Sequence, residues 1–116
     1  MSQAVLQAKL WYAQRISAMI LGLCVSIHLI IIFYAIRGGL TAEEILGRTQ
    51  GNTAFAIFYE IFVLACFVHA PIGVANILEE TFCKGFISKT LSWILAALII
   101  ILGTTAVIGV YTGGAL

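Results

Sequence analysis

The chain has 116 residues, of which 62% are apolar and only 9% are charged. Water-soluble domains carry about 25% charged residues, so this composition excludes a water-exposed surface over most of the molecule. The formal net charge is +1, which leaves no basic stripe to neutralise phosphates and excludes a nucleic-acid partner. These properties indicate an integral membrane protein that is surrounded by lipid.

Three long apolar segments follow one another along the chain, at about 16–36, 54–78 and 91–111. At about 1.5 Å per residue, each can cross about 30 Å of hydrocarbon. Backbone polar groups in lipid must be satisfied within their own segment, so we expect helices. The predicted fold is an all-α membrane protein with three transmembrane helices, in a single domain of residues 1–116 that forms part of a larger helical bundle.

The first connection, RGGLTAEEILGRTQGN, contains Thr41 and Glu44 at the spacing of a capping box, which predicts a short interfacial helix. Basic residues fall unequally on the two sides of the membrane, with Lys9, Arg15, Lys84 and Lys89 against Arg37 and Arg48. Because cytoplasmic loops carry the excess of Lys and Arg, we expect a cytoplasmic N-terminus and an external C-terminus. The expected location is the bacterial inner membrane or an equivalent energy-coupling membrane.

Two histidines lie inside apolar segments, His69 in FVLACFVHAPIGVANILEE and His28 in LGLCVSIHLIII. An imidazole inside a membrane needs a partner and is a candidate functional group. It can bond to a neighbouring helix or bind haem iron as an axial ligand. The depths of His28 and His69 in their segments place them on either side of the bilayer midplane. They can supply both ligands of one haem, or one ligand to each of two haems shared with a partner subunit, and the residues leave both open.

Other polar residues near or within the segments are further candidates. Arg15 at the edge of the first segment, with Trp11 and with Ser17 as a second donor, can hold a quinone, although Arg and Trp are also ordinary interfacial anchors. Glu60 lies roughly 9 Å inside the second segment, where a charged carboxylate is costly. We expect Glu60 to be protonated or paired and to be a proton-relay candidate, unless the segment begins later and Glu60 reaches the headgroups.

The motifs resemble those of the cytochrome b anchor subunit of succinate dehydrogenase and fumarate reductase. QRISAMILGL resembles the family's entry to its first helix, and His69-x-x-x-Gly73 followed by acids resembles its second signature. WYAQRISAMILGLCVSIH further resembles the two-haem branch. The resemblance implies that His69 and His28 are axial ligands of haem b, and that a quinone lies near Arg15. The signature arginine and its neighbour are replaced by Ala75 and Asn76, so charge compensation for the haem propionates would come from elsewhere.

The resemblance implies a haem b-binding anchor that passes electrons between an iron–sulfur subunit and membrane quinone. Dicarboxylate chemistry would take place in a flavoprotein subunit and its iron–sulfur partner, and a second membrane anchor subunit, or a second copy, would complete the assembly. Two alternatives stay open. One is a small proton-coupled transporter that uses Glu60, although such proteins generally need four spans and three are found. The other is a structural anchor without a cofactor.

Overall fold

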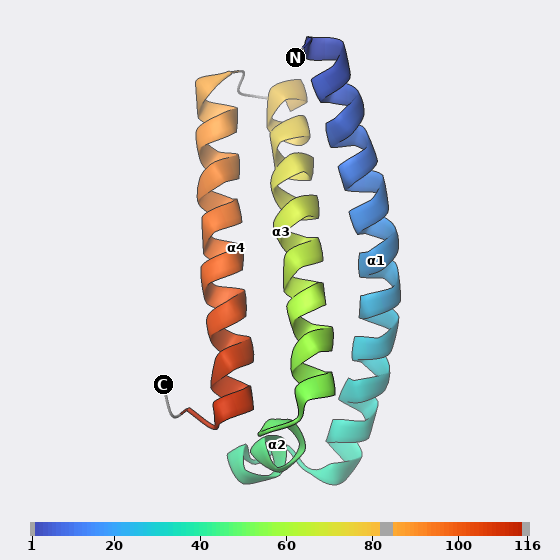
Figure 1. Cartoon of the computed structure of the whole chain (residues 1–116), viewed down its shortest axis with the longest axis vertical. Coiled ribbons are helices and arrows are strands. Elements are labelled where there is room, and N and C mark those ends of the chain that lie inside the picture. Colours follow the sequence, from blue (N-terminus) through green and yellow to red (C-terminus); the bar gives the residue numbers. More distant parts are fainter. Residues whose placement is uncertain (1, 82–84, 115–116) are drawn as a thin grey trace.

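The computed structural model describes residues 2–81 and 85–114. These residues form the helices α1 (Gln3–Gly38), α2 (Ala42–Thr49), α3 (Thr53–Thr81) and α4 (Phe86–Thr112), and no strand. In Figure 1, α3 runs between α1 and α4, and the short α2 lies across one end of the three. Each of the three long helices is apolar enough to cross a membrane. The all-helical fold with three membrane spans is therefore confirmed.

The first long helix is much longer than its predicted span, because it extends far beyond the apolar segment at its N-terminal end. Ser2 caps it, accepting a hydrogen bond from the Val5 amide at 3.2 Å, and the helix then runs for 36 residues. A helix satisfies its backbone hydrogen bonds within the chain, in water as well as in lipid. It therefore need not end at the edge of the hydrocarbon. The helix ends where Gly39 adopts a φ of +106°, a value that glycine tolerates.

The predicted interfacial helix is present as α2, and its capping box is formed. The Glu44 amide donates to Thr41 Oγ1 at 3.2 Å, and the Thr41 amide donates to the Glu44 carboxylate at 3.1 Å. The end of α2 is tied to the end of α4, because Thr49 Oγ1 donates to the Val110 carbonyl at 3.0 Å. The short helix thus closes the end of the bundle where the first connection lies.

Small residues fill the contacts between the long helices. The buried residues of these helices are Ser17, Cys24, Ala65, Pro71, Ser88, Ser92 and Ala96. Large side chains point outward instead, as for Met19 and Phe33, which are 69% and 68% exposed. This distribution is the reverse of a water-soluble core and is expected where lipid covers the outside and close backbone approach holds the helices together.

Basic residues lie at opposite ends of the bundle. Lys9 near the start of α1 and Lys89 near the start of α4 share one end, and Arg37 and Arg48 share the end that carries α2. Lys84, which also contributed to the predicted orientation, lies outside the described residues. We refer below to the N-terminal end and the α2 end of the bundle. Which end faces the cytoplasm stays a prediction.

Candidate functional site

Both histidines lie on the contact between α1 and α3. His69, on α3, faces the first half of α1, where its Nδ1 atom lies 3.3 Å from the Gln14 carbonyl oxygen and 3.4 Å from Ser17 Oγ. The Ser17 hydroxyl is itself buried and donates to the same carbonyl at 2.9 Å. Because a carbonyl oxygen can only accept, Nδ1 must carry the proton in its bond to Gln14. The lone pair of the neutral imidazole is then on Nε2.

His28, on α1, faces the other half of α3. Its Nδ1 atom lies 2.8 Å from the Tyr59 hydroxyl oxygen. Its ring packs edge-on against Tyr59 and Phe62, with centroids 5.6 Å away in both cases. A hydroxyl can donate or accept, so this bond permits either neutral tautomer of His28.

The Nε2 atoms of both histidines are not enclosed by the chain. Neither atom has a hydrogen-bond partner among the described residues. Within the same residues, no enclosed side-chain nitrogen or oxygen lacks a partner, so neither Nε2 is enclosed. Each histidine is therefore held by a hydrogen bond at Nδ1, and its Nε2 atom stays accessible from outside the chain.

The two histidines lie at different depths. Gln14 lies beside Gly73, Ser17 beside His69, and His28 beside Tyr59, which fixes an antiparallel register of the two helices. His28 is thus level with residue 59, and His69 lies ten residues further along α3, a rise of about 15 Å. The two histidines therefore lie at separate positions along the contact of α1 and α3.

Arg15 and Trp11 form a pair on the exposed side of α1. The guanidinium carbon of Arg15 lies 5.3 Å from the centroid of the Trp11 ring, within the range of a cation–π contact. Ser17, which was grouped with them in the quinone hypothesis, lies on the buried side of the helix and contacts His69. The structure therefore brings Arg15 and Trp11 together and places Ser17 with the histidine.

Glu60 lies on the opposite contact, between α3 and α4. It is half-buried, and Thr104 Oγ1 donates to its Oε1 atom at 2.9 Å. Nine residues separate Glu60 from His69 along α3, which at about 100° per residue places them on opposite sides of the helix. Glu60 thus lies on the opposite side of α3 from His69.

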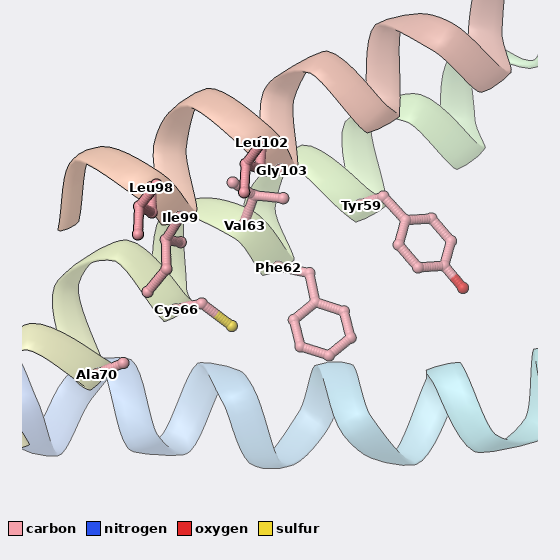
Figure 2. A pocket seen from close by; sticks show the side chains of 9 residues that line it. All are labelled: Tyr59, Phe62, Val63, Cys66, Ala70, Leu98, Ile99, Leu102 and Gly103. Carbon is pink, nitrogen blue, oxygen red and sulfur yellow. The ribbon is translucent and has the colours of Figure 1, made fainter. Parts of the chain in front are cut away.

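A groove of about 540 Å³ lies along α3 and α4 in the middle of the bundle. Its walls run from Tyr59 to Ala70 on α3 and from Leu98 to Gly103 on α4, and they are almost wholly apolar. Figure 2 shows the side chain of Phe62 pointing from α3 toward α1. Tyr59 and Phe62 are also the residues that contact His28, so the groove adjoins that histidine.

Three polar partners in these contacts were missed by the sequence interpretation: Gln14, Tyr59 and Thr104. Thr104 gave a signal, since it is a polar residue inside an apolar run. Gln14 acts on His69 through its backbone, which no side-chain pattern reveals. Within the described residues, no cluster of three or more His, Cys, Asp or Glu is arranged to hold a metal ion. Axial ligation of haem needs only one such residue on each side of the iron.

Comparisons with known proteins bear on the family to which this chain belongs. Searches of curated proteins and of solved structures give no match. The profile of the family described as "Succinate dehydrogenase/Fumarate reductase transmembrane subunit" matches residues 1–110. This range includes both histidines, Glu60 and most of α4, and it confirms the resemblance seen in the short motifs. The chain belongs to the family of succinate dehydrogenase/fumarate reductase transmembrane subunits.

Proposed function

We propose that this membrane subunit binds haem b through His69 and passes electrons between an iron–sulfur subunit and membrane quinone. The observation that carries the proposal is the arrangement of His69, whose Nδ1 is bound to the Gln14 carbonyl and whose Nε2 is open. Metal-binding histidines commonly donate their other N–H to a carbonyl, which fixes the tautomer and raises the basicity of the ligand nitrogen. The donor set therefore suits haem.

The chain's own residues would hold and orient the group. His69 would occupy one axial position near the N-terminal end, and His28 would occupy an axial position on a second haem toward the α2 end. A second membrane anchor subunit, or a second copy, would supply the opposite ligands. Haem, when bound, supplies one-electron redox chemistry at a potential that its ligands and apolar surroundings tune.

Quinone binding is proposed at the N-terminal end of α1. The Arg15 guanidinium is an always-charged donor that can bond a quinone carbonyl, and the exposed Trp11 ring beside it can pack on the quinone ring. Ser17, two residues further along α1, lies on the buried side of the helix and contacts His69, so its hydroxyl is grouped with the proposed haem ligand. The cytoplasmic position proposed for this end would place the quinone next to the iron–sulfur subunit.

The partners follow from the family. A flavoprotein subunit and an iron–sulfur subunit would carry the succinate and fumarate chemistry, and this chain would anchor them to the bacterial inner membrane or an equivalent one. The N-terminal end would face the cytoplasm, because Lys9, Arg15 and Lys89 lie there.

Absorption spectra of the purified complex test the proposal. We expect a b-type spectrum that loses a component in His69→Ala and regains it when free imidazole is added. The matched control is Cys66→Ala, which changes a half-buried residue one turn away on the same helix and should keep the full spectrum. Rescue by imidazole separates loss of a ligand from misfolding. An unchanged spectrum in His69→Ala would refute the assignment.

A further inference from the structure

A second groove, of about 370 Å³, runs along the contact of α3 and α4 at the α2 end of the bundle. Its outer end is formed by Thr53 and Tyr111, whose hydroxyl oxygens lie 3.4 Å apart, and its inner end by Glu60 and Thr104. Seven residues of α3 separate the two ends, a depth of about 10 Å. The walls between them are Ala56, Ile57, Val107 and Ile108. The groove therefore leads from the polar end of the helices to a single carboxyl.

The carboxyl at the inner end has one partner and one open oxygen. Thr104 donates to Oε1 at 2.9 Å. Oε2 has no partner among the described residues, and it is not enclosed, since no enclosed side-chain oxygen there lacks a partner. The groove thus gives access to Oε2 of Glu60.

Among the residues that line this groove, no cation accompanies the carboxyl. The residues that line the groove include no Lys, Arg or His, and their other titratable group is the Tyr111 phenol. On α3, the Tyr59 hydroxyl is turned to His28, and on α2 the Arg48 guanidinium donates to the Gly39 carbonyl at 2.7 Å. A charged carboxylate is costly at such a depth when no cation lies beside it.

Beyond Glu60, toward the N-terminal end, α3 and α4 pack closely. A Cβ on Gly103 would lie 2.7 Å from Val63 Cγ1, so the side chain of Val63 packs directly on the α4 backbone. At the other end, the Gly51 amide donates to the Tyr111 carbonyl at 2.9 Å and fixes the polar connection beside the groove. The groove therefore offers a short route to Glu60 from the α2 end.

We infer that Glu60 is a proton-exchanging carboxyl whose proton comes from, and returns to, the membrane face that carries α2. The proton moves between water at the Thr53–Tyr111 rim and Oε2 of Glu60, and Thr104 stays bonded to Oε1 in both states. The groove is thus a half-channel. This inference goes beyond the proposed function and does not require haem.

Dicyclohexylcarbodiimide is a suitable probe, because it partitions into lipid and adds across its C=N bond only to the protonated acid. The complete complex is prepared in sealed vesicles of each orientation and treated with the probe. In each preparation the pH is varied on one face of the membrane and held constant on the other. Mass spectrometry of the α3 peptide gives the labelling rate. We expect the rate to fall about tenfold per pH unit on the α2 face once Glu60 is mostly ionised, and to ignore the pH on the N-terminal face.

One variant and an internal control sharpen the result. Glu60→Gln should remove the label from the peptide that contains position 60, and the exposed Glu43 on α2 should stay unlabelled. The inference is overturned if unmodified Glu60 is not labelled, if its labelling ignores the pH on both faces, or if it follows the N-terminal face.

Discussion

Replacing Gly103 by alanine tests the close packing of α3 against α4. The added Cβ would lie 2.7 Å from Cγ1 and 2.9 Å from Cγ2 of Val63, whereas carbon atoms in good contact are about 3.5–4.0 Å apart. The helices must move apart or Val63 must leave its rotamer, and such overpacking costs about 1–3 kcal/mol. Alanine gains about 1 kcal/mol over glycine from helix propensity. The net loss of stability is then about 0–2 kcal/mol.

Gly109→Ala is the matched control, because it lies on the same helix and its added Cβ meets nothing within 4 Å. Both variants gain the same propensity, so the difference between them isolates the clash, at about 1–3 kcal/mol. The assay is unfolding of the purified complex by dodecyl sulfate in mixed micelles, followed by tryptophan fluorescence. Val63→Ala in the Gly103→Ala background should recover most of the difference. Equal stability of Gly103→Ala and Gly109→Ala would refute the packing argument.

Three further predictions concern other contacts. Tyr59→Phe removes the oxygen that accepts a hydrogen bond from His28 when Nδ1 carries the proton. Redox titration should then show a higher midpoint potential for the haem proposed at His28 and no change for the haem proposed at His69; equal shifts of both would contradict the separation in depth. Arg15→Gln removes a charged donor worth about 1.5–3 kcal/mol, so the KM for quinone should rise about tenfold or more, with an unchanged haem spectrum. Thr41→Ala removes the cap of α2 at a cost of about 1 kcal/mol, so amide exchange should accelerate in α2 and not in α3.

The membrane spans and the interfacial helix were predictable because their signals are local. These signals are the runs of apolar residues and the spacing of Thr41 and Glu44. Each predicts a helix whose backbone hydrogen bonds are formed within the same segment. The ends of the helices were predicted less well, as in α1, which begins at Gln3 although its apolar run begins near Ile16. Hydropathy predicts where a helix enters the lipid. The helix itself begins and ends at capping residues or glycines, which can lie well outside the lipid.

The partners of the candidate site residues were not predictable, because they depend on the register between helices. Chemistry predicts that His28 and Glu60 need hydrogen-bond partners in lipid. It does not predict that these partners are Tyr59 and Thr104. Register is set by where small residues allow close approach, as at Gly103. In an apolar helix with small residues at many positions, several registers satisfy the same local pattern.

The position of α3 between α1 and α4, by contrast, follows from its polar residues. His69 and Glu60 lie on opposite sides of one helix. In lipid, each of these polar groups favours a partner from another helix, since lipid tails cannot bond to it. A helix with polar groups on two opposite sides is therefore stabilised by a neighbour on each, as Figure 1 shows for α3. The same arrangement places the proposed haem ligands on the α1 side and the proposed proton-exchanging carboxyl on the α4 side, with the body of α3 between them.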